Sequence, residues 1–265
     1  MVSLTSVSWL LTEDDGEIRR LTINRPDRKN AVPPDGWPVL RDAFVDFEKS
    51  EARVLIVTGA GEEFCAGADL ARGEAVTGES VPDRHRRMKT VGEAATALHR
   101  TTKPTIAAVD GVAVGAGMNL ALGCDVVVAS TRARFSEIFV RRGLTVDFGG
   151  TWLLPRIVGL QRAKELALSG RIVEADEALR LGLVIDIVSP DELADRAREL
   201  ADGFLVGAPL AQMFAKQGLN ASFESSFSDS LSWEGQSQVI ALGSADSAEG
   251  IEAFMNKRTP NWRGE

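Results

Sequence analysis

Short apolar runs alternate with segments of helical periodicity through the first half of the chain. The apolar runs predict buried strands, and the longer segments, in which apolar residues recur every three or four positions, predict helices. We expect strands at residues 6–11, 18–24, 53–59, 105–109 and 125–129, and helices at 36–49 and 83–100. A turn is expected at residues 13–16, and residues 71–82, which are polar and without periodicity, are expected to be mobile. The alternation predicts right-handed β-α-β units in a mostly parallel sheet.

The second half of the chain is predicted to be largely helical. Residues with 3.6-residue periodicity follow one another from Thr151 onward, with one apolar run at 183–188 that predicts a short strand. Helices are expected at residues 162–169, 174–181, 191–205 and 209–223, with two more within 227–257. We therefore expect a core over residues 1–200 and a helical region over residues 201–265.

A turn of small residues, residues 113–119, follows the apolar run at 105–109. Gly115, Ala116 and Gly117 let another group approach their backbone closely. A helix is predicted from Asn119 to Gly123, and the first turn of a helix presents unpaired N–H groups that favour an anion. Such small residues more often serve close packing of a strand against a helix, so the turn alone predicts no more than a generic anion site.

Composition narrows the function classes. The net charge of −8 and the isoelectric point near 5.0 argue against a general nucleic-acid binder. The two cysteines, Cys65 and Cys124, exclude a disulfide scaffold, and residues 1–8 lack the pattern of a secretion signal. No apolar run has the length of a membrane span, so we expect a cytoplasmic protein. Without tyrosine and with two histidines, phenolic acid catalysis is excluded and a histidine metal site is not expected.

Several motifs together resemble the crotonase (enoyl-CoA hydratase/isomerase) superfamily. They are FCAGADL at 64–70, PTIAAVDG at 104–111, NLALGCD at 119–125, NRP at 24–26 and EGIEAFMNKR at 249–258. The resemblance implies an α/β fold, a ClpP-like spiral of β-β-α units with a helical C-terminal region that assembles as trimers and often hexamers. It also implies an acyl-CoA thioester as substrate, with no separate cofactor. From the composition and the apolar pattern we expect no metal, no nucleic acid and no membrane partner.

The same resemblance assigns positions to the substrate. The backbone N–H groups of Ala68 and Ala116 are implied to hold the thioester oxygen, at a strength of about 3–4 kcal/mol per donor in other oxyanion holes. Positions around the CoA moiety and the acyl pocket are occupied by Arg28, Ala66, Asp69, Leu70, Phe139, Phe254 and Lys257. A basic helix end that complements the helix dipole is an equal explanation for Lys257. RNA binding and a CoA-binding scaffold without catalysis are kept as alternatives of other classes.

The reaction is suggested by departures from the family pattern. Hydratases of this family carry two glutamates, and here the corresponding positions are Asn119 and Phe139. Glu137 lies two residues early, and we expect it to be a salt-bridged or surface carboxylate, with a place in the site as the alternative. Asp147 falls on a position that other family members use, in an apolar loop that should raise its pKa toward that of a general base. The alternative for Asp147 is an N-cap of the helix that contains Thr151 and Trp152.

The segment GGTWLLPR at 149–156, with Asn119 and Asp147, resembles the phenylacetate-pathway branch, which contains 1,2-epoxyphenylacetyl-CoA isomerases that are also Δ3,Δ2-enoyl-CoA isomerases. A carboxamide at position 119 cannot take a proton at neutral pH. Moving a double bond needs one base, whereas hydration is served by two carboxylates. We therefore predict an enoyl-CoA isomerase acting on a 3-enoyl or ring-derived acyl-CoA, with enoyl-CoA hydratase as the alternative.

Overall fold

The computed structural model describes residues 8–70 and 80–265. The chain divides into two compact units. The first runs to Ala201 and excludes residues 102–104, and the second consists of those three residues and residues 202–265. Most of the segment that was expected to be mobile, residues 71–79, lies outside the described residues.

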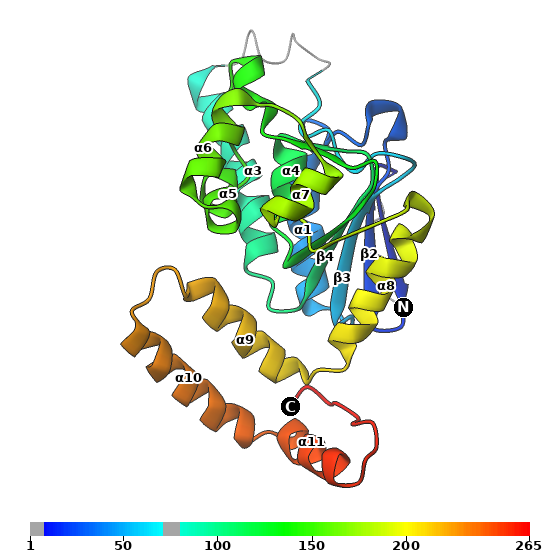
Figure 1. The fold of residues 1–265 in the computed structure, drawn as a ribbon, viewed down its shortest axis with the longest axis vertical. Coiled ribbons are helices and arrows are strands. Elements are labelled where there is room, and N and C mark those ends of the chain that lie inside the picture. Colours follow the sequence, from blue (N-terminus) through cyan, green and yellow to red (C-terminus); the bar gives the residue numbers. More distant parts are fainter. Residues whose placement is uncertain (1–7, 71–79) are drawn as a thin grey trace. The chain divides into compact units, whose positions relative to one another are not determined.

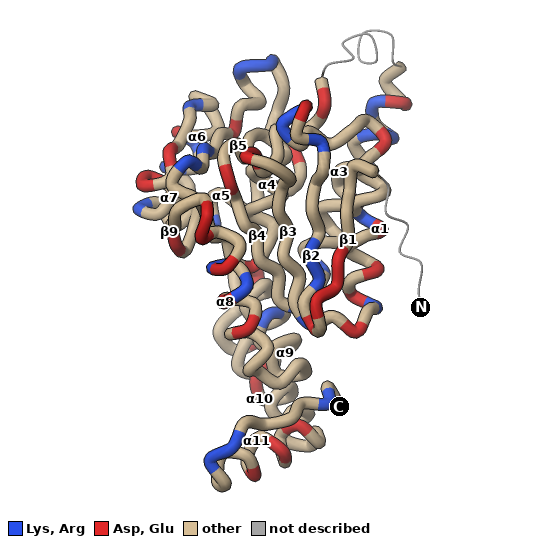
Figure 2. The backbone as a smooth tube through the Cα atoms, turned by 90° about the vertical axis from the view of Figure 1, so that its right-hand side faces the viewer, with Lys and Arg blue, Asp and Glu red and all other residues tan. Residues whose placement is uncertain are grey.

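A six-stranded sheet forms the centre of the first unit (Figure 2), with the strand order β1-β2-β3-β4-β6-β9. All neighbours pair in parallel except β1 with β2. The strands are β1 Leu10–Asp15, β2 Ile18–Ile23, β3 Val54–Gly59, β4 Thr105–Val109, β6 Val126–Ser130 and β9 Asp186–Val188. The apolar runs of β3 and β4 are buried because both faces of the sheet are covered, as is typical of parallel strands. The prediction of a mostly parallel α/β fold is confirmed.

The first strand differs from its prediction. It was expected at residues 6–11 with a turn at 13–16, but β1 begins at Leu10 and continues through Asp15, which pairs with Ile18. The acidic residues stay extended because β1 lies at the edge of the sheet (Figure 2), and the polar end of this strand is exposed. Arg19 on β2 holds this end by an ion pair of 2.7 Å with Asp14.

Helices pack around this sheet (Figure 1). The predicted helix at 36–49 is confirmed as α1 Gly36–Lys49, which buries Trp37, Leu40, Phe44 and Phe47 on one face. Helix α3 Val81–His99 begins two residues before its prediction because Ser80 caps its first turn. The other helices are α5 Gly150–Val158, α6 Leu160–Ser169, α7 Ala175–Leu181 and α8 Leu193–Leu205, with 3-10 turns η1 Pro26–Arg28, η2 Ile138–Arg142 and η3 Pro190–Glu192.

A second, three-stranded sheet was not predicted. It consists of β5 Val112–Val114, β7 Arg134–Ser136 and β8 Val173–Glu174, in the order β5-β7-β8. Helix α4 Ala116–Leu122 follows β5 directly and begins three residues before the predicted start at Asn119. Gly115 makes the connection with a φ of 58°, a conformation that glycine adopts without steric cost. The small sheet therefore places the start of α4 next to the ends of β5 and β7.

The second unit contains three helices: α9 Pro209–Ala221, α10 Phe227–Leu242 and α11 Ala245–Met255. Helices α9 and α10 lie side by side (Figure 1). The C-terminal tail folds back to α11, where the buried Asp246 accepts hydrogen bonds from the N–H groups of Arg263 and Gly264, at 2.6 and 2.9 Å. Among the described residues, no helix is long and apolar enough to cross a membrane.

Candidate active site

Two segments that are far apart in the sequence meet at the turn between β5 and α4. Cys65 donates its N–H to the carbonyl of Val112 (2.8 Å), and its own carbonyl accepts from the N–H of Val114 (3.1 Å). This pairing carries Gly67, with a φ of 83°, against the turn, where a Cβ atom on Gly67 would lie 2.9 Å from the carbonyl oxygen of Val114 and 3.3 Å from the nitrogen of Ala116. Gly67 is therefore needed both for its conformation and for the close approach.

The meeting of these segments brings the two expected oxyanion donors together. Ala116 is the first residue of α4, so its N–H has no partner within the helix. In the part of the chain that the structure describes, no backbone carbonyl accepts from the N–H of Ala68 or Ala116. The dipole of α4 adds to the preference for negative charge at this point. Two such N–H groups on touching segments can stabilise an oxygen that becomes anionic.

Hydrogen bonds with residues 25–32 fix the loop that carries Ala68. The N–H of Ala66 donates to the carbonyl of Lys29 (2.9 Å), and the N–H of Asp69 donates to that of Val32 (2.9 Å). Arg25 forms an ion pair of 2.8 Å with the carboxylate of Asp69. The side chain of Asp69 therefore holds the loop in place. Two other residues expected at the CoA, Arg28 in η1 and Leu70, are exposed near the same loop.

Asn119 is the centre of a buried polar cluster behind the turn. Its side chain is fully buried, and its Nδ2 donates to the backbone carbonyl of Asp147 (2.9 Å) and to Oε2 of Glu137 (3.4 Å). Gly150, the first residue of α5, gives it room, because a Cβ atom there would lie 2.3 Å from Nδ2. Asn119 thus connects α4 to the loop before α5 and to the residue after β7.

The expectation that Glu137 is a salt-bridged or surface carboxylate is wrong. Glu137 is fully buried beside Asn119. The reason is the unpredicted small sheet: β7 pairs in parallel with β5, and the N–H of Gly115 donates to the carbonyl of Ser136 (2.9 Å), so the residue after β7 lies beside the oxyanion turn. Burial raises the pKa of Glu137 to about 7; the hydrogen bond from Asn119 opposes this rise, and the charge of Asp147 adds to it.

Asp147 lies in the loop before α5 with one carboxylate oxygen, Oδ1, that is buried and without a hydrogen-bond partner among the described residues. Burial raises its pKa to about 6, which confirms the expectation for an apolar loop. The alternative reading of Asp147 as an N-cap is wrong, because the cap of α5 is Gly149 and no side chain caps it. Phe148, which follows Asp147, has a φ of 49°, an uncommon value for a non-glycine residue.

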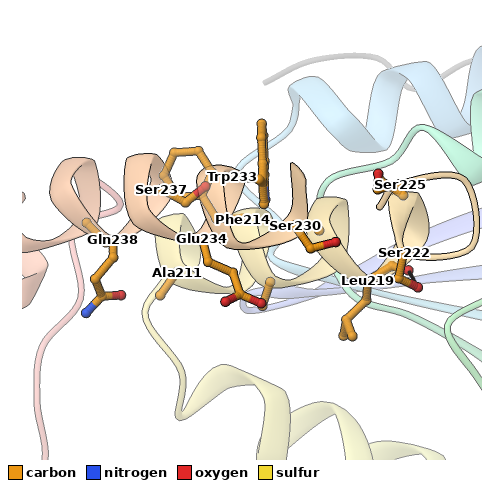
Figure 3. Close-up of a pocket in the computed structure, with 14 residues that line it drawn as sticks. Ala211, Phe214, Leu219, Ser222, Ser225, Ser230, Trp233, Glu234, Ser237 and Gln238 are labelled. Carbon is orange, nitrogen blue, oxygen red and sulfur yellow. Dashed lines mark hydrogen bonds between the residues drawn. The ribbon is translucent and has the colours of Figure 1, made fainter. Parts of the chain in front are cut away.

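The remaining predicted positions lie in different places. Phe139 in η2 is buried, and a Cβ atom on Gly115 would lie 3.6 Å from its ring, so it packs beneath the oxyanion turn. Phe254 and Lys257 belong to the second unit, where both are exposed. That unit also holds a cavity of about 450 Å³ between α9 and α10, lined by residues that include Phe214, Leu219, Trp233 and Glu234 (Figure 3). All residues that line this cavity belong to the second unit.

Comparison with known proteins identifies the family. The sequence model of the enoyl-CoA hydratase/isomerase family matches residues 13–265. The chain belongs to this family. A 1,2-epoxyphenylacetyl-CoA isomerase of Escherichia coli (strain K12) is 35% identical over 261 residues, which cover 98% of this chain and 100% of the relative. A short-chain-enoyl-CoA hydratase of Clostridium acetobutylicum is also 35% identical, covering 94% of this chain and 95% of the relative.

The solved structures agree with this assignment. The crystal structure of an enoyl-CoA hydratase/isomerase from Cupriavidus metallidurans CH34 matches with a TM-score of 0.89 and 36% identity, covering 98% of both chains. This enoyl-CoA hydratase/isomerase family member therefore has the crotonase fold, which confirms the fold class and the family expected from the motifs. Its relatives carry the names of both isomerases and hydratases. The chain is thus an acyl-CoA enzyme of the enoyl-CoA hydratase/isomerase family, and the names of its relatives do not decide between the two reactions.

Proposed function

We propose that this enzyme shifts a double bond of an enoyl-CoA thioester from the 3,4 to the 2,3 position, with Asp147 as the base. The main support is the state of Asp147, which has a buried oxygen without a partner among the described residues and a pKa raised to about 6. Asn119, at the first glutamate position of the hydratases, uses its amide to hold the backbone of Asp147 and cannot accept a proton. One base is what isomerisation requires.

The proposed reaction conserves protons. The Asp147 carboxylate removes a proton from C2 of the 3-enoyl thioester. The electron pair of that C–H bond forms a double bond between C1 and C2, and the π pair of the carbonyl moves onto the thioester oxygen to give a dienolate. The N–H groups of Ala68 and Ala116 would stabilise that oxygen by about 3–4 kcal/mol each, as oxyanion-hole donors do elsewhere. The protonated Asp147 then returns the proton to C4, and the carbonyl re-forms with the double bond at the 2,3 position.

Substrate contacts are proposed from the family positions. The exposed side chains of Arg28 and Leu70 border the loop that carries Ala68, where the CoA moiety would bind, and the backbone of Ala66 and Asp69 shapes the same loop. Phe139, packed beneath Gly115, would form part of the acyl pocket. The C-terminal element that carries Lys257, with Phe254 one helical turn earlier, is proposed to contact CoA phosphates by way of a neighbouring subunit.

Assays with two alternative substrates test the reaction type. The wild-type enzyme is offered a 3-enoyl-CoA and crotonyl-CoA in separate assays, and the product is identified by chromatography of the acyl-CoA pool. The proposal expects conversion of the 3-enoyl-CoA to the 2-enoyl form and slow hydration of crotonyl-CoA. Rapid hydration of crotonyl-CoA without isomerisation of the 3-enoyl-CoA would refute it.

Enoyl-CoA hydration is the second candidate, and one observation favours it. Glu137 is buried beside Asn119, and the charge of Asp147 acts on it, so the site holds two carboxyl groups although neither family glutamate position carries one. Two carboxyl groups suit the activation of water together with control of the proton at C2. The crotonyl-CoA assay decides between the two candidates.

Self-association into trimers or hexamers is proposed from the surface of the second unit. Its helices expose large apolar side chains, a feature that marks interaction surfaces: Leu219, Phe223, Phe227, Leu231, Val239, Ile240, Leu242, Ile251, Phe254 and Met255. Light scattering coupled to gel filtration measures the mass in solution. Three or six copies of the 28.5-kDa chain are expected, and a monomer would contradict the proposal.

A further inference from the structure

Three buried oxygen atoms around Asn119 are without hydrogen-bond partners among the described residues. They are Oδ1 of Asn119, Oε1 of Glu137 and Oδ1 of Asp147. Buried polar atoms are nearly always paired, and an unpaired one costs about 1–3 kcal/mol. All three atoms are acceptors when both carboxyl groups are ionised, and the amide of Asn119, which could donate to them, is already engaged. The cluster therefore lacks a donor.

The charges around Glu137 point to the same deficit. On α4 the neighbour is the uncharged Asn119, and from the loop before α5 the one charge that acts on Glu137 is Asp147. Near the turn after α6, Arg141 donates to the carbonyl of Ser169 (3.1 Å), and Arg171 is engaged by two carboxylates, those of Glu165 and Glu177. Within residues 8–70 and 80–265, no cation thus compensates the buried Glu137 and the partly buried Asp147, and ionising both would place like charges together in a poorly solvated site.

We propose that Glu137 is a positioning residue that keeps a proton while Asp147 is ionised, so that the pair carries one negative charge and one O–H donor. The inference rests on the proposed function, because it assumes that Asp147 is the base. The neutral Glu137 supplies one O–H donor, which can pair with one of the two other unpaired oxygens, those of Asn119 and Asp147. It fixes the loop of Asp147 and keeps a second negative charge away from the oxyanion turn beside which it lies.

The catalytic cycle leaves the proton of Glu137 in place. The proton that is transferred leaves C2, resides on Asp147 and returns to C4, so Glu137 gains and loses nothing. When Glu137 ionises at higher pH, its charge stands beside both the Asp147 carboxylate and the developing dienolate, and both states rise in energy. The active form is therefore the pair with one proton, and the pair titrates as a unit.

A pH profile of kcat/KM for isomerisation tests this arrangement in the wild type, in Glu137→Gln and in Glu174→Gln. Glu174 is exposed on β8, so its substitution removes the same charge elsewhere in the same unit. We expect kcat/KM of the wild type and of the Glu174→Gln variant to rise as Asp147 ionises, near pH 6, and to fall as Glu137 ionises, near pH 7. The amide introduced by Glu137→Gln cannot ionise, so the profile of that variant should rise to a plateau without the alkaline fall.

Two results would overturn the inference: a wild-type profile without an alkaline fall, or a Glu137→Gln profile that retains it. A titration of wild-type enzyme labelled with carboxyl-¹³C glutamate gives an answer even when the variant does not fold. One glutamate resonance should titrate near pH 7, and the absence of any such resonance would refute the proposal. Failure of the proposed function is distinguished by a different experiment. Full activity of Asp147→Asn would refute Asp147 as the base, whereas the glutamate titration of the wild-type enzyme would be unaffected by that result.

Discussion

The contact between Gly150 and Asn119 gives a sharp test of how the site is built. A Cβ atom on Gly150 would lie 2.3, 2.5 and 2.6 Å from Nδ2, Oδ1 and Cγ of Asn119. Asn119 is fully buried, and its Nδ2 holds the backbone carbonyl of Asp147 at 2.9 Å. Gly150→Ala must therefore displace Asn119 or the start of α5, and either movement breaks this connection.

The magnitude follows from two costs. Overpacking a buried site costs about 1–3 kcal/mol, and leaving a buried hydrogen-bonding group unpaired costs about 1–3 kcal/mol more. We expect a loss of about 2–6 kcal/mol in the free energy of unfolding. A displacement of the base by about 1 Å should lower kcat by about a hundredfold.

Urea unfolding and isomerase assays of Gly150→Ala measure both effects. Gly92→Ala is the matched control, because Gly92 lies on the exposed face of α3 with nothing within 4 Å of an added Cβ, so it should slightly stabilise the protein and leave kcat unchanged. In an Asn119→Ala background the clash is relieved, and the stability penalty of Gly150→Ala should shrink. The reasoning would be refuted if Gly150→Ala matched the wild type in stability and kcat. It would also be refuted if the stability penalty of Gly150→Ala were as large in the Asn119→Ala background as in the wild type.

Two further predictions concern the oxyanion loop and the carboxyl pair. Gly67 has a φ of 83°, and a Cβ atom there would lie 2.9 Å from the carbonyl oxygen of Val114, so Gly67→Ala should displace the N–H of Ala68 and lower kcat about 10²–10³-fold. Gly16→Ala, at a φ of 61° in open space, is the control and should leave kcat unchanged; equal activities of the two variants in a kinetic assay would contradict the prediction. The folded-state pKa values of Glu137 and Asp147, about 7 and about 6, lie above the ordinary 4.5 and 3.8. The unfolded state therefore releases these protons first, so the stability that this pair contributes is fully present below about pH 4 and is lost as the pH rises through 6 and 7. Urea unfolding measures the free energy of unfolding at pH 5 and at pH 8. Its decrease between these pH values should be smaller in Glu137→Gln than in the wild type, and equal decreases would exclude Glu137 as a source of the pH dependence.

Long elements with local periodicity could be predicted from the sequence, and short ones could not. Helix α1 has four buried aromatic and aliphatic residues at helical spacing, so its bounds follow from local pattern. Strands β5, β7 and β8 have two or three residues each, too few to show a period. Their existence depends on pairings between distant segments, such as Val114 with Ser136.

The same distinction applies to the site. The raised pKa of Asp147 was predictable because its apolar neighbours lie in the same loop. The position of Glu137 was not, because the pairing of β7 with β5 buries it and no residue near it in the sequence indicates that pairing. The one available signal was that Glu137 follows the apolar Phe135 and the small Ser136, within a segment otherwise rich in arginine.

The central claim is that Asp147 is the base, and the rate of Asp147→Asn with a 3-enoyl-CoA tests it most directly. Asparagine keeps the size of the side chain and cannot accept the C2 proton. Binding of the substrate, measured by calorimetry, serves as the check that the site is intact. With binding retained, kcat should fall by about 10²–10⁴-fold, the usual contribution of a general base. Unchanged turnover would contradict the account.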